Sequence, residues 1–142
     1  MFDTLVVDVK GPIAEIRLDR PEKLNPLSTQ TLIELARAAR FVDDHREVKI
    51  VVVRGAGRAF SAGADLSSFA GRQTLSPRDA AEVGREMADA LESMRAVSIA
   101  AIQGWCVGGG LVLAAACDLR IGNVVDAPNF TVSAVLPEAI FG

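Results

Sequence analysis

The stretch Ile99-Ala-Ala-Ile-Gln-Gly-Trp-Cys-Val-Gly-Gly-Gly-Leu-Val-Leu-Ala-Ala-Ala-Cys-Asp118 determines how the rest of the chain is interpreted. It predicts a short apolar strand, a turn, three consecutive glycines and an apolar helix. Each glycine costs a helix about 1 kcal/mol relative to alanine, so three at a helix start need a reason. Either another group approaches the backbone closely, or the first-turn N–H groups stay open to a negatively charged acceptor.

Length and composition predict a single globular domain over 1–142. Half of the 142 residues are hydrophobic, 23% are charged, and the net charge is −3. Basic residues are spread along the chain, so we expect neither nucleic acid nor an anionic membrane as a partner. Cys106 and Cys117 lie in apolar surroundings and are interpreted as reduced core residues. Because no uncharged apolar run reaches the roughly 18 residues of a membrane span, we expect a cytoplasmic location.

Strands and helices are expected to alternate along the chain. Strands are predicted at 4–10, 13–19, 49–54, 98–103, 119–121 and 130–133. The first two form a hairpin, and the β-branched run 49–54 suits a strand buried on both faces. Ser28 is a natural N-cap for one helix, and Pro77 is a first-turn residue for another. This alternation predicts an α/β fold with a largely parallel sheet.

Two segments of small residues, each following a predicted strand, are candidates for a ligand site. They are Phe60-Ser-Ala-Gly-Ala-Asp65 and Val107-Gly-Gly-Gly110. In open α/β sheets, ligands gather at the carboxyl ends of the strands. Small side chains leave the backbone N–H groups accessible, and two N–H groups that point at one oxygen form an oxyanion hole. Taken singly, each segment is equally well explained as a tight turn that needs a positive φ.

These paired motifs resemble the crotonase (enoyl-CoA hydratase/isomerase) superfamily. The similarity rests on residues 59–66 and 102–120 and on the opening loop Asp19-Arg-Pro-Glu-Lys-Leu-Asn-Pro-Leu27, in the family's order and spacing. It implies a crotonase-like spiral of β-β-α repeats whose C-terminal part is missing from this chain, and a homo-oligomer, trimer or hexamer. It also implies an acyl-CoA thioester as substrate and no separate cofactor, because coenzyme A is part of the substrate.

The resemblance also implies particular site residues. The oxyanion donors would be the backbone N–H groups of Ala62 and Gly109, which would stabilise a thioester enolate. The substrate-binding residues would be Ala62, Gly63, Ala64, Asp65, Gly109, Lys23 and Leu24. Arg58 also lies where the family contacts coenzyme A, although an exposed basic side chain is usually only a solvated charge.

The acid–base residues depart from the family pattern. The first glutamate of the hydratases falls at Val112, which cannot transfer a proton, and this argues against two-glutamate hydration. The second corresponds to Glu138 if an insertion follows Phe130, and to Ala134 if there is none; we favour Glu138. One carboxylate beside an oxyanion hole suits double-bond isomerisation better than hydration. The alternative is a non-catalytic acyl-CoA-binding or structural homologue that has lost its glutamates.

The remaining candidate residues favour structural roles. The only histidine, His45, is expected at an exposed helix end, and with the separated cysteines it argues against a metal site. Ser61 lacks the spacing of a nucleophile elbow and is interpreted as a turn residue. The spacing of Gly55-Ala-Gly57 does not fit a dinucleotide fingerprint. Asp65 and Asp118 are expected to cap or orient backbone.

Overall fold

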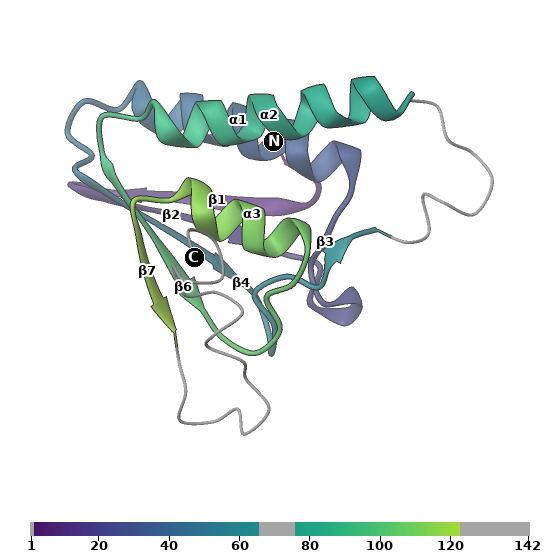
Figure 1. Ribbon diagram of the computed structural model, residues 1–142. Coiled ribbons are helices and arrows are strands. Elements are labelled where there is room, and N and C mark those ends of the chain that lie inside the picture. Colours follow the sequence, from purple (N-terminus) through teal and green to yellow (C-terminus); the bar gives the residue numbers. More distant parts are fainter. Residues whose placement is uncertain (1, 66–75, 123–142) are drawn as a thin grey trace.

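A computed structural model describes residues 2–65 and 76–122 (Figure 1). The strand predicted at 130–133 lies outside the described residues, as do Glu138 and Ala134. The other predicted strands and helices are all present, with the bounds given below.

The main element is a five-stranded sheet with the strand order β1-β2-β4-β6-β7. The five strands are β1 Leu5–Lys10, β2 Ile13–Leu18, β4 Ile50–Gly55, β6 Val97–Ile102 and β7 Leu119–Gly122. β1 and β2 form the predicted antiparallel hairpin, and every later neighbour in the sheet is parallel. The predicted hairpin and largely parallel sheet are therefore confirmed.

A second, two-stranded sheet was not predicted. It pairs β3, Pro26–Leu27, with β5, Gly63–Ala64, in parallel. Each strand is only two residues long, too short for an alternating pattern to show in the sequence. This small sheet ties the loop after β2 to the small-residue segment after β4.

Helix starts follow the predicted capping residues. In α1, Thr29–Asp43, the Ser28 side chain accepts the N–H of Thr31. In α2, Pro77–Glu92, the Ser76 side chain accepts the N–H of Asp79, and Pro77 occupies the first turn. The glycine helix α3 spans Gly109–Ala116, and a short 3-10 helix spans Pro21–Lys23. Within the described residues, no helix is long and apolar enough to cross a membrane.

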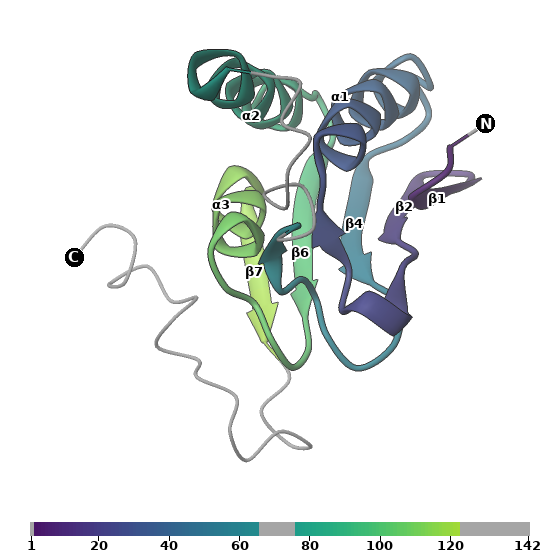
Figure 2. The same cartoon turned by 90° about the vertical axis from the view of Figure 1, so that its right-hand side faces the viewer.

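The three helices cover one face of the five-stranded sheet (Figures 1 and 2). They share one core with the strands, and its fully buried members include Leu35, Met87, Leu91, Leu113, Ile16 and Val51. The sequence predicted β4 to be buried on both faces, which is wrong. Val51 and Val53 are fully buried, but Val52 and Arg54 on the other face are only half-buried.

The face of the sheet turned away from the helices is uncovered, and it carries the charged side chains Glu15, Arg17 and Arg54 as well as apolar ones. The exposed apolar side chains on it are Ile13, Ile50, Val97, Leu119 and Ile121. Strand register places Ile13 beside Ile50 and Ile50 beside Val97, so these side chains form a continuous row. A continuous apolar run in sequence cannot distinguish a strand covered on both sides from one with an apolar but uncovered face.

Candidate functional site

The two small-residue segments lie side by side, as their position after parallel strands predicted. Ser61 forms a parallel bridge with Cys106. The N–H of Phe60 donates to the carbonyl of Gln103 at 2.8 Å, and the N–H of Ser61 donates to the carbonyl of Trp105 at 3.0 Å. The N–H of Val107 donates back to the carbonyl of Ser61 at 3.2 Å. These bonds fix the segment after β4 against the segment after β6.

Close backbone approach explains two of the glycines at this junction. A Cβ on Gly63 would lie 2.7 Å from the carbonyl oxygen of Val107, and its φ of 92° also disfavours other residues. A Cβ on Gly110 would lie 2.9 Å from the carbonyl oxygen of Ser61. The first of the two explanations for the glycine run, close approach of another group, is therefore realised at Gly110.

The second explanation, an open backbone donor, applies to Gly109. In the first turn of α3, the N–H of Gly110 donates to Val107, and those of Leu111 and Val112 donate to Gly108. Gly109 begins the helix, and within the described part of the chain its N–H has no backbone acceptor. A helix N-terminus favours negative charge, so this N–H is suited to hold an anionic oxygen.

The prediction for Ala62 as an oxyanion donor is contradicted by its hydrogen bond. Its N–H donates to the carbonyl oxygen of Leu24 at 2.9 Å, so this donor is already used inside the protein. Ala64 is the alanine that lies near the glycine helix. Its backbone nitrogen would be 3.9 Å from a Cβ on Gly109, and the nitrogen of Gly109 would be 3.4 Å from a Cβ on Gly63. The structure thus brings Gly63, Ala64 and Gly109 together. Ala62 instead has a structural role, because its N–H holds the segment after β4 against the loop after β2.

Lys23 and Leu24 lie where the 3-10 helix ends. Lys23 is exposed, and Leu24 has a left-handed backbone with a φ of 62°. Leu24 reaches the site through its carbonyl, which accepts the N–H of Ala62. Arg58 is exposed, and its carbonyl packs so closely against Gly104 that a Cβ there would lie 2.0 Å away.

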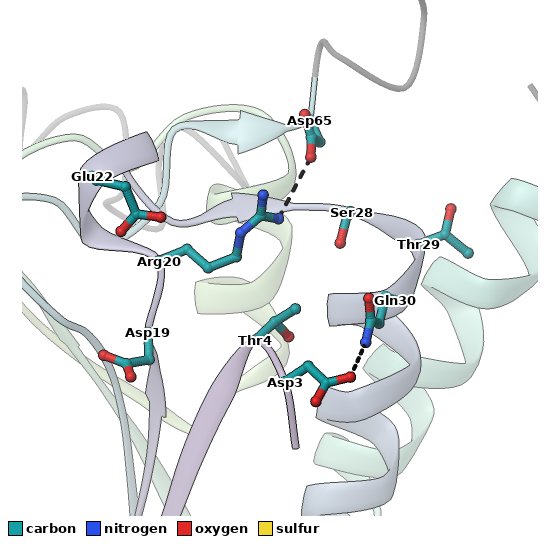
Figure 3. A pocket seen from close by; sticks show the side chains of 9 residues that line it. All are labelled: Asp3, Thr4, Asp19, Arg20, Glu22, Ser28, Thr29, Gln30 and Asp65. Carbon is teal, nitrogen blue, oxygen red and sulfur yellow. Dashed lines mark hydrogen bonds and ion pairs between the residues drawn. The ribbon is translucent and has the colours of Figure 1, made fainter. Parts of the chain in front are cut away.

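Asp65 faces a polar pocket of about 640 Å³ beside the small sheet (Figure 3). Its carboxylate lies 3.6 Å from the guanidinium of Arg20. The other lining residues are Asp3, Thr4, Asp19, Glu22, Ser28, Thr29 and Gln30. The Arg20 pair anchors the end of the segment after β4 to the loop after β2, which agrees with the orienting role expected of Asp65.

Val112 lies in the first turn of α3, three residues beyond Gly109, and its side chain is 55% exposed. Trp105 and Val107 in the preceding loop are also exposed. The position at which hydratases carry their first glutamate is therefore an apolar side chain at the surface of the described structure.

Both cysteines are buried and free, as predicted. Burial raises the pKa of the Cys106 and Cys117 thiols to about 12. Each thiol is therefore protonated at neutral pH and unsuited to act as a nucleophile. In residues 2–65 and 76–122, no group of three His, Cys, Asp or Glu side chains is placed to hold a metal ion.

The structural interpretation of Asp118 is confirmed, and His45 lies at a helix end as expected. His45 is half-buried rather than exposed, and its Nδ1 lies 2.9 Å from the carbonyl of Phe41. The carboxylate of Asp118 accepts the N–H of Ser98 at 2.9 Å, and the Asp118 N–H donates to the Ser98 hydroxyl at 2.9 Å. Asp118 therefore orients backbone at the start of β7.

Comparison with known proteins identifies the family. The family model for enoyl-CoA hydratase/isomerase matches residues 8–136. Since this match covers most of the chain, the protein belongs to the enoyl-CoA hydratase/isomerase family, the crotonase superfamily. The predicted fold class is confirmed with it.

Relatives of this chain include both hydratases and an isomerase. The crotonyl-CoA hydratase of Syntrophomonas wolfei is 30% identical over 121 residues, which cover 84% of this chain and 46% of that protein. The peroxisomal Delta(3,5)-Delta(2,4)-dienoyl-CoA isomerase of Arabidopsis thaliana is 35% identical over 115 residues, which cover 72% of this chain and 41% of that protein. The chain thus spans just under half the length of these curated relatives.

Solved structures confirm the same fold. An enoyl-CoA hydratase/carnithine racemase from Magnetospirillum magneticum superposes with a TM-score of 0.80 at 34% identity. The superposition covers 86% of this chain and 47% of that one. The described residues therefore correspond to about half of a crotonase fold.

Proposed function

We propose that this chain holds the thioester carbonyl of an acyl-CoA substrate and stabilises its enolate, in an enzyme of the hydratase/isomerase type. The donors are the N–H groups of Gly109 and Ala64. One observation carries the proposal: the backbone of Gly63 and Ala64 is packed against the first residue of the glycine helix, whose N–H has no acceptor in the described residues. Gly63, Asp65, Lys23 and Leu24 complete the expected substrate contacts.

The chemistry needs donors where negative charge develops. Removing a proton next to a thioester carbonyl moves charge onto its oxygen, and two fixed N–H groups stabilise that charge without reorganising. Loss of one such donor typically lowers the rate by about 10²–10³. The positive end of the α3 dipole adds to this stabilisation.

Proton transfer requires a group outside the described residues. We propose Glu138 as the acid/base, with Ala134 as the alternative occupant of that position. Val112 supplies no second carboxylate, so we favour isomerisation of a double bond over hydration. Coenzyme A arrives as part of the substrate, and we propose the trimeric or hexameric homo-oligomer that the family resemblance implies.

A second candidate function is a non-catalytic acyl-CoA binder. The exposed Val112 favours it, because the helix face beside Gly109 presents an apolar side chain where hydratases carry a carboxylate. Such a protein would retain the backbone donors and lack turnover.

Binding and turnover measured in parallel separate the two candidates. Calorimetry with acetoacetyl-CoA tests the backbone donors, and we expect saturable one-site binding. Short enoyl-CoA substrates then test chemistry: isomerisation into conjugation raises the thioester–alkene absorbance and hydration lowers it. A rise that Glu138→Gln abolishes supports the isomerase, and binding without any absorbance change supports the binder. Absence of binding would overturn both.

A further inference from the structure

Ser61 lies where three segments of the chain meet. It is fully buried, and its hydroxyl donates to the carbonyl of Asn25 at 2.7 Å. The same oxygen accepts the N–H of Gly63 at 3.1 Å. Its own N–H and carbonyl bond to Trp105 and Val107 of the glycine segment. One residue, through its hydroxyl and its backbone, therefore connects the loop after β2, the segment after β4 and the loop before α3.

Asn25 gives this connection a rigid base. It is 1% exposed and has a left-handed backbone with a φ of 52°. Its side-chain amide donates to the carbonyls of Ala56 and Ala59, both at 2.9 Å, and its Oδ1 accepts the N–H of Arg20 at 2.9 Å. A non-glycine residue keeps such a backbone only when its surroundings over-determine it, and clusters of such residues occur at functional sites.

We propose that Ser61 is a positioning residue, held by Asn25, that sets the spacing of the two oxyanion donors. The hydroxyl fixes the N–H of Gly63, the residue directly before the donor Ala64. The backbone of Ser61 simultaneously fixes the loop that leads to the donor Gly109. The two donors are thereby held relative to one another through one residue that does not touch the substrate. This inference rests on the proposed function.

Ser98 offers a matched control. It is also a fully buried serine, and its hydroxyl bonds to the N–H of Asp118 at 2.9 Å and to the Asp118 carboxylate at 3.3 Å. It lies at the start of β6, whereas the glycine segment follows the end of that strand. Ser61→Ala and Ser98→Ala each remove one buried hydroxyl with two hydrogen bonds, but Ser98→Ala leaves the donors untouched.

The test uses the 142-residue chain and acetoacetyl-CoA, whose enolate has its own near-ultraviolet absorbance. We expect the bound ligand to enolise at a lower apparent pKa than the free ligand. Ser61→Ala should raise that apparent pKa by about one unit, which corresponds to about one lost hydrogen bond. Ser98→Ala should leave it unchanged. Ser61→Cys keeps the size of the side chain but donates weakly, so its apparent pKa for the bound ligand should lie between those of wild type and Ser61→Ala. If Ser61→Ala does not fold, Ser61→Cys takes its place in the test.

A Ser61 variant that binds with the wild-type enolisation pKa would overturn the proposal. Amide exchange in the ligand-free protein is the second measurement, with faster exchange at Gly63 expected in Ser61→Ala and not in Ser98→Ala. If wild type does not bind acetoacetyl-CoA, the proposed function fails. In that case, faster amide exchange at Gly63 in Ser61→Ala than in wild type would still show that Ser61 orders this segment. Unchanged exchange at Gly63 would overturn that role of Ser61 as well.

Discussion

A fully buried serine lies near each end of strand β6, Ser98 within the strand and Ser61 in the segment that pairs with Cys106 beyond it, and the two serines have different roles. At the start of the strand, the Ser98 hydroxyl and N–H and the Asp118 N–H and carboxylate satisfy one another in a closed set. At the far end, Ser61 ties down the N–H of Gly63, while the N–H of Gly109 nearby has no acceptor in the described residues. At one end the polar groups satisfy one another, whereas at the other a backbone N–H has no acceptor in the described residues, which is where we propose that the thioester oxygen binds. The difference indicates that ligand chemistry belongs to the carboxyl ends of the parallel strands.

The largest expected effect comes from Gly63→Ala at the far end. The new methyl group would lie 2.7 Å from the Val107 carbonyl, at a residue with a φ of 92°. Strain and overlap together should lower the free energy of unfolding by about 3 kcal/mol, and displacement of a donor should weaken acetoacetyl-CoA binding by about 100-fold. Urea unfolding and calorimetry measure the two quantities.

Gly84→Ala is the control for that substitution. Gly84 lies inside α2 with nothing within 4 Å of the added methyl group. Alanine should therefore stabilise the fold by about 0.5–1 kcal/mol without affecting the ligand. Equal binding losses in both glycine variants would contradict a donor site next to Gly63, at Ala64.

A smaller effect is expected at the closed end. Asp118→Ala leaves the N–H and hydroxyl of Ser98 without their acceptor, and the unfolding free energy should fall by about 2 kcal/mol. Acetoacetyl-CoA affinity, corrected for the unfolded fraction, should stay within twofold of wild type. Asp118→Asn, which keeps an acceptor oxygen, should recover part of the stability. Loss of affinity in the folded Asp118→Ala protein would show that the two ends are coupled.

The smallest effect concerns a second closed set, around Glu34 in α1. Its buried carboxylate accepts the N–H groups of Asp3 and Thr4, both at 2.9 Å, and also the Thr4 hydroxyl at 2.6 Å. Burial alone would raise the pKa of Glu34, but these hydrogen bonds outweigh it and hold the pKa below the usual 4.5. The ionised form therefore stabilises the fold above about pH 4.5, and this contribution is lost as the pH falls through the folded-state pKa.

Glu34→Gln tests that pH dependence. The neutral amide should lower the unfolding free energy by about 1 kcal/mol at pH 7, because it replaces charge-assisted hydrogen bonds with neutral ones. The difference between variant and wild type should shrink as the solution is acidified below pH 4.5. Urea titrations at pH 7, 5 and 3.5 measure this difference, and a gap that widens with acid would contradict the assignment.

Local patterns predicted most of the main sheet and all three helices. The hairpin follows from alternating residues around Gly11, and the starts of α1 and α2 follow from Ser28 and Pro77. Small residues after two predicted strands indicated the two segments of the site, and the family resemblance added the specific role of Gly109. These features depend on residues close in sequence or on motifs with fixed spacing, which a single sequence contains.

Long-range hydrogen bonds explain what the sequence did not predict. Our proposal of Ala64 in place of Ala62 rests on Leu24, whose carbonyl accepts the N–H of Ala62 across 38 positions of chain. The pairing of β3 with β5 and the uncovered face of β4 likewise depend on tertiary contacts. One indication of the role of Asn25 was present in the sequence, its residue type. Asparagine tolerates a left-handed backbone, and Asn25 lies in the proline-containing loop after β2.

The alkylation rates of the two buried thiols report how often each end of β6 opens. Cys106 pairs with Ser61 at the site end, and Cys117 precedes Asp118 at the closed end. Burial raises both pKa values to about 12, so at neutral pH an alkylating reagent reacts with either one only after its surroundings open. The ratio of the two alkylation rates, followed by mass spectrometry of the peptides, compares how often each end opens. An acyl-CoA ligand that binds at the far end would slow the modification of Cys106 selectively.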